Sequence, residues 1–404
     1  MPASPAPRLS PWLALLFSVA CALAVANVYY AQPLLDAMAR DFAIDPALVG
    51  LVVTLTQVGY GLGLILLVPL GDLFERRRLI VLQSLLSVLA LLMIALATSS
   101  AWLFVGMALT GLLAVVTQLL VAHAASVSAD TERGHVVGMV TSGIVIGILL
   151  ARTLSGAMAD LAGWRSIYAL SAALTLLMTL LLWRVLPAHT AARPNTGYGA
   201  LLVSLWQLVR EQPVLRQRAL LAMLSFASAM VLWTPLVLPL SAPPLSLSAT
   251  EVGLFGLAGA AGALAAARAG GLADRGLGQR VSGLSLLLMI GSWGAIALTQ
   301  QSLWALLLGV VVFDLGLQAL HVASQSLIYR LPADTHSRLT AAYMLFYSIG
   351  SALGSLASTL AYAWGGWLLV CVLGAGLNVL ALGYWWRTVR QPAQNCTSSI
   401  TLSR

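Results

Sequence analysis

Polar side chains interrupt an otherwise apolar stretch of the sequence at residues 302–329. Asp314, Gln318, His321 and Gln325 lie there at successive spacings of four, three and four residues. That spacing places all four side chains on one face of an α-helix. The opposite side carries apolar or small residues, and a polar stripe facing lipid is prohibitive, so the stripe is expected to face a cavity or another helix.

Asp314 is the member of this stripe with the clearest chemistry. It lies about twelve residues into the segment, or about 18 Å at 1.5 Å per residue, which is near the bilayer midplane. A charge there costs about 2.5–3.5 kcal/mol on insertion scales, and burial favours the protonated acid. We therefore expect Asp314 to bind and release a coupling proton, and a cationic substrate competing for the same carboxylate would produce exchange. The alternative is a structural role, with Asp314 hydrogen-bonded to a neighbouring helix.

Two further groups at membrane depth could handle protons or substrate. His321 is expected either to relay the proton towards the cytoplasm or to satisfy a contact between helices. Arg152 interrupts the apolar segment 134–158, which is expected to run outward. Its guanidinium would pair with a carboxylate, bind an anionic substrate group or extend to the outer membrane surface. Pairing with Asp314 would require the two halves of the chain to meet.

Other segments carry side chains suited to an amphipathic substrate. Asn27 and Tyr30 lie three residues apart on one helical face, with Tyr29 and Gln32 beside them. An amide and phenolic hydroxyls suit a partly apolar, hydrogen-bonding substrate, and an aromatic belt at the membrane surface is the alternative. Segment 217–241 would add either an adaptable apolar wall or ordinary packing through Phe226, Met230 and Trp233. The predicted substrate cavity comprises Asn27, Tyr30, Gln118, Arg152, Trp233, Gln318 and Gln325.

The composition excludes a soluble protein. Of 404 residues, 60% are hydrophobic and 8% are charged, whereas soluble domains carry about 25% charged residues. The net charge of +8 is therefore assigned to membrane topology, and nucleic acid is not an expected partner. Cys21, Cys371 and Cys396 are too scattered for a disulfide framework or a metal site. No Walker-type loop or nucleophile–base pair occurs, so neither an enzyme nor a bound cofactor is predicted.

The apolar segments predict an all-α membrane protein. A span of the hydrocarbon core takes about 20 mostly apolar residues, longer than a transmembrane strand. Twelve transmembrane helices are expected at 11–36, 46–71, 78–98, 101–127, 134–158, 163–187, 217–241, 247–271, 279–299, 302–329, 334–362 and 364–388. The predicted domains are an N-terminal six-helix bundle (1–187), a cytoplasmic linker (188–216), a C-terminal six-helix bundle (217–390) and a cytoplasmic tail (391–404).

The linker carries a mixed pattern. Residues 199–212 combine apolar side chains with Gln207, Arg210 and Glu211. Such a segment is interpreted either as an amphipathic helix on the membrane surface or as an ordinary linker.

Arginine placement predicts orientation, since all 21 basic residues are arginine. With twelve spans and an internal N-terminus, eighteen arginines fall on the inner side and only Arg40 and Arg165 on the outer side. This asymmetry satisfies the positive-inside rule with both termini cytoplasmic. The exclusive use of arginine is typical of a GC-rich genome, so the inner membrane of a bacterium is the expected location.

Several sequence features recur in the second half of the chain at a nearly constant offset from the first. The tripeptide at 49–51 recurs at 252–254, and the Gly-Trp pair at 163–164 recurs at 366–367, both at an offset of 203 residues. Asp72 and Asp274, each just before arginines, differ by 202. A shared offset predicts a parallel duplication, with two bundles related by a pseudo-two-fold axis and a substrate site near the midplane between them.

Loop motifs carry a resemblance to a known family. The stretch PLGDLFERRRL at 69–79 has Asp72, Arg76 and Arg77 between two spans, and GGLADRGLGQRV at 270–281 repeats the pattern with Gly270, Asp274, Arg275 and Arg280. These motifs resemble the cytoplasmic loop motif of the major facilitator superfamily. The stretches NVYYAQPLL at 27–35 and LLARTLSG at 149–156 look like a bacterial branch of proton-coupled exporters within it.

The resemblance implies two bundles that rock about a central cavity lined by the first, fourth, seventh and tenth helices. It also implies that the loop motifs act as a cytoplasmic latch, a contact made in one state and released in the other; arginines that only anchor the topology are the alternative. Many proton-driven members carry an arginine in the fourth helix, whereas segment 101–127 has none. The family's proton relay is therefore not transferred to this chain.

Together these features predict a secondary transporter. The leading hypothesis is proton-coupled export of a small amphipathic drug or metabolite by a monomer in the lipid bilayer. Proton-linked uptake of a sugar or organic anion is the alternative, in which Arg152 would matter more. A membrane receptor or scaffold that moves nothing is a third hypothesis, for which the stripe at Asp314 would be unnecessary.

Overall fold

The computed structural model describes residues 10–128, 132–186, 197–331 and 336–390, and everything described is helix, turn or loop. The N-terminal half contains α1 (Pro11–Tyr29), η1 (Gln32–Leu34), α2 (Leu35–Phe42), α3 (Leu51–Leu66), α4 (Leu70–Leu73), α5 (Arg76–Ala95), α6 (Ser100–Ala114), α7 (Val116–Val127), α8 (Arg133–Ala162) and α9 (Arg165–Val185). Helices α1 and α2 with η1 form the first span, α3 and α4 the second, and α6 and α7 the fourth.

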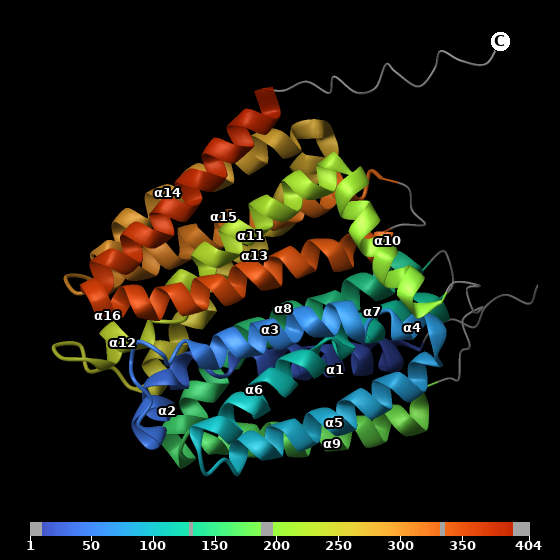
Figure 1. Cartoon of the computed structure of the whole chain (residues 1–404), viewed down its shortest axis with the longest axis horizontal. Helices are drawn as coiled ribbons and strands as arrows, with labels where there is room; N and C mark the ends of the chain where they lie inside the picture. The colour runs from blue at the N-terminus through green and yellow to red at the C-terminus, as the bar shows by residue number, and fades with distance from the viewer. Residues whose placement is uncertain (1–9, 129–131, 187–196, 332–335, 391–404) are drawn as a thin grey trace, which may run out of the picture.

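The C-terminal half repeats this order after α10 (Tyr198–Glu211). It contains α11 (Pro213–Trp233), α12 (Val237–Ser241), α13 (Ala249–Leu272), the π-helical turn η2 (Ala273–Leu277), α14 (Gly278–Ala297), α15 (Leu303–Ile328) and α16 (His336–Arg390). Figure 1 shows the two halves as separate bundles that lie side by side, blue to green and yellow-green to red.

The predicted fold class and its twelve helices are confirmed. Nine helical segments among the described residues are long and apolar enough to cross a membrane. Helix α16 supplies two spans, because it kinks at Gly365 and Gly366. Adding the shorter apolar helix α3 and the helix α13 completes the twelve.

The predicted duplication has a local structural counterpart. Gly163 ends α8 with a φ of 80°, and Gly366 divides α16 with a φ of 60°. Glycine tolerates this left-handed region, which L side chains rarely adopt. The two Gly-Trp pairs therefore mark the same turn in both bundles, between the fifth and sixth helix of each.

The linker contains the helix that its sequence pattern favoured. Helix α10 has no buried residue, and Val203 and Trp206 are exposed on it. Its Tyr198 hydroxyl donates to the Leu66 carbonyl oxygen at 2.9 Å, which attaches the start of α10 to the N-terminal bundle. Its position on the membrane surface stays a prediction.

Two pairs of helices make the largest contacts between the bundles: α8 with α13, and α3 with α16. We call these contacts the α8–α13 seam and the α3–α16 seam. Both seams allow backbones to meet, because a Cβ on Gly253 would lie 2.4 Å from the Arg152 carbonyl oxygen and one on Gly50 would lie 2.6 Å from the Ser355 carbonyl oxygen. The end of the molecule that carries α2 and α12 lies opposite the end that carries α4 and α10 (Figure 1), and we call these the α2 end and the α4 end.

Candidate functional site

Arg152 of α8 reaches from the N-terminal bundle onto an aromatic side chain of the other bundle. Its guanidinium carbon lies 3.9 Å from the centre of the Trp233 ring and 5.3 Å from that of Tyr29. Its Nε donates to the Gln32 side-chain oxygen at 2.5 Å. Only 6% of Arg152 is exposed, and a desolvated cation over an indole gains about 2 kcal/mol or more. The stacking therefore compensates part of the cost of burying this charge.

Asp314 of α15 contacts the edge of the same indole. The Trp233 Nε1–H group donates to Asp314 Oδ1 at 3.4 Å. A Cβ on Gly259 would lie 2.5 Å from Asp314 Oδ2, so a larger residue there would force the carboxylate to shift. Trp233 thus contacts the cation with its face and the carboxylate with its edge.

The two charges belong to one electrostatic unit without a direct ion pair. The ion pairs among the described residues are Arg40 with Asp36, Arg78 with Glu75 and Arg165 with Asp41, and Arg152 and Asp314 are absent from them. Trp233 connects the charges instead. We call Gln32, Arg152, Trp233 and Asp314 the bridging cluster, because its members come from both bundles.

Aromatic side chains extend the bridging cluster towards the α4 end. The Tyr29 and Tyr347 hydroxyls lie 2.7 Å apart and join α1 to α16. Phe226 packs on Tyr347 at 4.1 Å and on His321 at 5.4 Å between ring centres. His321 Nδ1 lies 3.0 Å from the Tyr343 hydroxyl. His321 therefore faces other helices of its own bundle, as the polar stripe on α15 requires.

A small cavity adjoins the cluster on the side of the α2 end. The volume open to the centre of a water molecule is about 10 Å³, and the lining residues are Gln32, Pro33, Arg152, Trp233, Leu236, Val237 and Val252. Sites for drug-sized ligands have about 300–1,000 Å³. In this arrangement of the bundles the cavity is too small for such a substrate, so the bundles must move apart to admit one.

Several residues predicted for the cavity lie elsewhere. Asn27 accepts a hydrogen bond from the Ser171 hydroxyl at 2.6 Å, and the Tyr30 ring packs edge-on against Tyr168, so both face α9 within the N-terminal bundle. Neither residue belongs to the bridging cluster in this arrangement, and their role in a substrate cavity stays a prediction. Gln32, at the start of η1, belongs to the cluster instead.

The three glutamines predicted for the substrate cavity are not members of the bridging cluster either. Gln118 donates to the Tyr60 hydroxyl at 3.3 Å, inside the N-terminal bundle. Gln318 and Gln325 are half-buried on α15, one and three turns after Asp314. Sequence reasoning missed Tyr347 of α16, although hydroxyl residues recur at helical spacing after it at Ser348, Ser351 and Ser355.

The α8–α13 seam is closed by a carboxylate. Asp160, near the end of α8, accepts hydrogen bonds from the Thr250 backbone N–H at 2.8 Å, the Thr250 hydroxyl at 2.5 Å and the Ala249 N–H at 3.3 Å. These are groups at the first turn of α13, where a negative charge is favourable. Thr153 also donates to the Gly253 carbonyl oxygen at 3.1 Å.

The α3–α16 seam is closed by hydroxyl groups. Thr359 donates to the Ala47 carbonyl oxygen at 3.0 Å, and Thr54 donates to the Ala352 carbonyl oxygen at 3.2 Å. Further along, the Ser348 hydroxyl donates to the Gln57 carbonyl oxygen at 2.5 Å. Both seams therefore hold the bundles together over the half of the molecule nearest the α2 end.

The loop-motif arginines contact their own bundle. Arg76 donates to the carbonyl oxygens of Gly71 and Ala122 at 3.1 and 3.2 Å, and Arg77 donates to that of Trp183 at 2.6 Å. In the second motif, Arg275 and Arg280 are exposed. The side chains of Asp72, Gly270 and Asp274 lie outside the described residues, so the predicted latch stays a prediction.

Comparison with known proteins places this architecture in a family. The model of the Major Facilitator Superfamily matches residues 15–296 and 219–401. The chain is 47% identical to the "Uncharacterized transporter YgaY" of Escherichia coli O157:H7 over 389 residues, which cover 96% of this chain and 98% of that protein. It is 24% identical to the "Probable sugar efflux transporter" of Helicobacter pylori (strain HPAG1), with 88% and 89% of the two chains covered.

A solved structure shares the fold. The crystal structure of a bacterial homolog to the human lysosomal transporter Spinster, in an inward-facing and unoccupied conformation, has a TM-score of 0.76 at 15% identity. The match covers 94% of this chain and 96% of that one. With the family match over both bundles and the relative at 47% identity, the conclusion is plain: this chain belongs to the major facilitator superfamily, and it is a multi-pass membrane transporter of small molecules, not an enzyme.

Proposed function

We propose that this transporter exports a small amphipathic compound from the cytoplasm of a bacterium in exchange for protons. The observation that carries the proposal is the bridging cluster. It joins a carboxylate of one bundle to a guanidinium of the other through a single indole. A group that changes its charge at such a joint can change the affinity of the bundles for each other.

Proton binding would act through the edge of Trp233. While Asp314 is ionised, its hydrogen bond from the indole is charge-assisted, and such bonds are about twice as strong as neutral ones. Protonation removes the charge that balances Arg152 across the ring. The cluster is then less favourable, so the equilibrium moves towards the state in which the bundles separate at the α2 end.

Substrate binding would use the same carboxylate from the other side of the membrane. A cationic or hydrogen-bonding group that occupies Asp314 excludes the proton, and a proton excludes that group. Phe226, Tyr347 and Met230 supply apolar contacts close to the cluster. Mutually exclusive binding at one site gives exchange without a further device.

The topology proposed with this function keeps both termini in the cytoplasm of the inner membrane. The α4 end, with the arginine-rich loops, then faces the cytoplasm. In the described arrangement both seams close the α2 end, so the substrate would enter from the cytoplasmic side. The latch formed by the loop motifs would close that side in the opposite state.

The test uses inside-out vesicles with an acid interior and a pH-sensitive dye. A mixed pool of lipophilic cations and neutral drugs is added to wild type, Asp314→Asn and Asp36→Asn. Asp36 is the matched control, because it is a carboxylate in a surface pair with Arg40 at 2.8 Å. We expect proton release in wild type and Asp36→Asn and none in Asp314→Asn. Equal release in Asp314→Asn would remove Asp314 from the coupling step.

A second candidate is transport of a sugar, which the name of the Helicobacter pylori relative favours. Gln32 and Arg152 present an amide and guanidinium N–H groups near the adjoining cavity, which are suitable donors for sugar hydroxyls or a carboxylate. Absence of proton release in wild type with the drug pool would contradict drug export. Labelled sugars and organic anions would then be tested in the same vesicles, in both directions.

Membership of a transporter family argues against the receptor or scaffold hypothesis. A binding protein that moves nothing has no need for a carboxylate and a guanidinium that meet between two bundles. Transport without proton movement, by contrast, would keep the family assignment and remove only the coupling.

A further inference from the structure

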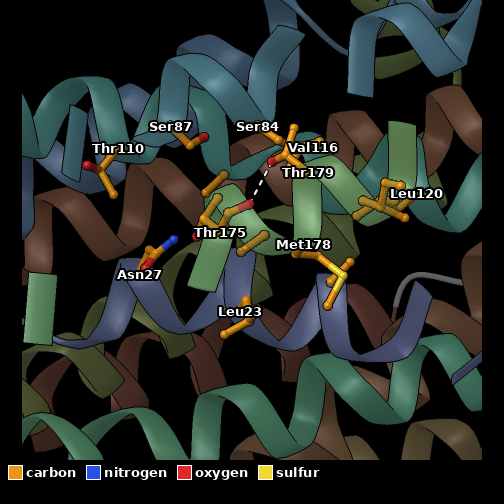
Figure 2. A pocket seen from close by; sticks show the side chains of 14 residues that line it. Leu23, Asn27, Ser84, Ser87, Thr110, Val116, Leu120, Thr175, Met178 and Thr179 are labelled. Atoms are coloured by element: carbon orange, nitrogen blue, oxygen red, sulfur yellow. Dashed lines mark hydrogen bonds between the residues drawn. The ribbon is translucent and has the colours of Figure 1, made fainter. Parts of the chain in front are cut away.

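A second buried polar region lies inside the N-terminal bundle, away from the bridging cluster. Figure 2 shows a cavity between α1, α5, α6, α7 and α9 into which several small polar side chains point. Its polar lining residues are Asn27, Ser84, Ser87, Thr110, Thr175 and Thr179. Leu23, Val116, Leu120 and Met178 are among the apolar ones. None of its lining residues carries a charge, so the cavity is suited to a neutral ligand.

Two hydroxyl groups of this lining lack a protein partner. Thr110 is 2% exposed, and neither its Oγ1 nor that of Thr175 has a hydrogen bond within the described part of the chain. Leaving a buried hydroxyl unsatisfied costs about 1–3 kcal/mol. Native structures rarely contain such groups, so a ligand that hydrogen-bonds both hydroxyls is to be expected.

Other polar groups of the lining keep part of their hydrogen-bonding capacity. Asn27 spends its side-chain oxygen on the Ser171 hydroxyl at 2.6 Å, and its amide nitrogen points towards Thr175 in Figure 2. Thr179 donates to the Thr175 carbonyl oxygen at 2.6 Å, which leaves its oxygen able to accept. The cavity therefore offers both donors and acceptors to a molecule that can do both.

The size of the cavity selects the ligand. The volume open to the centre of a water molecule is about 20 Å³. By that measure one water needs about 10–15 Å³. One or two water molecules fit, whereas a sugar or a drug does not.

We propose that this cavity is an internal hydration site, in which one or two ordered water molecules bind Thr110, Thr175 and the Asn27 amide. The waters connect α1 to α6 and add to the direct contact of Asn27 with Ser171 of α9. Because Asn27 lies on α1 only five residues before Gln32, the site also helps to position η1, which follows α1 and carries Gln32 of the bridging cluster.

Stability measurements on Thr110→Val test the proposal by the sign of the effect. If water satisfies the hydroxyl, valine removes that hydrogen bond and leaves a methyl group facing water, so the melting temperature falls by about 1–3 °C. If no water is bound, valine removes an unsatisfied hydroxyl, so the melting temperature stays or rises. The matched control is Thr56→Val, since the Thr56 hydroxyl is buried in the same bundle and donates to Val52 of its own helix at 2.9 Å. Both variants are expected to melt below wild type, and a melting temperature of Thr110→Val equal to or above that of wild type would overturn the hydration site.

Two measurements do not depend on how that one variant folds. If Thr110 and Thr175 share the same water, the melting temperature of the double variant Thr110→Val/Thr175→Val falls by less than the sum of the falls in the two single variants. In a wild-type density map that resolves ordered waters, one or two peaks are expected within hydrogen-bond distance of Thr110 Oγ1. Additive losses without such peaks would exclude a shared water, and an elongated peak would identify a larger ligand instead.

Discussion

The two seams between the bundles have different chemistry. The α8–α13 seam contains charges, since Arg152 and Asp160 lie on α8 and Asp314 packs against Gly259 of α13. The α3–α16 seam contains hydroxyl groups that donate to backbone carbonyl oxygens. Neutral hydrogen bonds contribute about 0.5–1.5 kcal/mol each, and bonds to charged groups about 1.5–3 kcal/mol.

This difference indicates a division of labour. Hydroxyl groups on α16 can re-form bonds with other carbonyl oxygens when the helices slide, at little cost. A carboxylate at a helix N-terminus or a guanidinium on an indole has few equivalent partners. We infer that the α8–α13 seam sets which end of the transporter is closed, whereas the α3–α16 seam accommodates the movement.

After the loss of proton release in Asp314→Asn, the next largest effect is expected at Arg152. Arg152→Gln removes the cation over Trp233 and leaves Asp314 without a balancing charge, so transport should fall on the order of 100-fold. Arg152→Lys should restore little, because an ammonium cannot stack on the ring while donating to Gln32. Proton release in vesicles measures both variants, with Arg40→Gln as the control in a surface pair. Unaltered export by Arg152→Gln would show that Arg152 does not bind substrate or couple the bundles.

A smaller effect is expected at the end of the same seam. Asp160→Asn replaces charge-assisted bonds to Thr250 and Ala249 by neutral ones, which should shift the equilibrium about tenfold towards opening at the α2 end. Spin labels at Leu161 and Trp364, which are 81% and 82% exposed at that end of the two bundles, report the distance between them.

A matched control for Asp160 lies on the same helix N-terminus. Glu251 of α13 accepts a hydrogen bond from the Ser248 backbone N–H at 2.8 Å and stays within its own bundle. Glu251→Gln should leave the distance between the labels unchanged. If both variants lengthen it equally, the effect comes from α13 itself and not from the seam.

Trp233→Phe separates the two contacts of the indole. Phenylalanine keeps an aromatic face for Arg152 and removes the N–H that binds Asp314, so we expect proton-coupled transport to fall about three- to tenfold. Trp293→Phe is the control, because that buried indole of the same bundle donates to the Ser228 hydroxyl at 3.3 Å. Equal losses in both variants would assign the effect to packing.

Much of the fold could be predicted because its signals are local. Segment length predicted the spans, and the Gly-Trp pairs marked equivalent turns in both bundles. The charged members of the site also stood out, since a charge in an apolar helix is conspicuous. Each of these signals can be recognised within a single segment, without knowing which helices pack together.

The partners within the site could not be predicted in the same way. Helix α1 is apolar on all sides, so no stripe distinguishes the face of Asn27 and Tyr30 from that of Tyr29 and Gln32. Its rotation is set by close packing against helices far along the chain, as where a Cβ on Gly147 would lie 2.4 Å from the Ala22 carbonyl oxygen. Such contacts depend on the tertiary structure and leave no periodic trace in the sequence.

The smallest effect is expected in the α3–α16 seam, and it would sharpen the comparison most directly. Thr359→Val removes the hydroxyl that donates to the Ala47 carbonyl oxygen, at the same end of the molecule as Asp160. That bond is neutral, and its acceptor can bind water when the seam opens. We therefore expect the ratio of open to closed populations, measured from the distance distribution of the same spin labels, to change about twofold or less. A shift as large as that of Asp160→Asn would mean that both seams set the equilibrium equally, and the division of labour between charged and neutral contacts would be wrong.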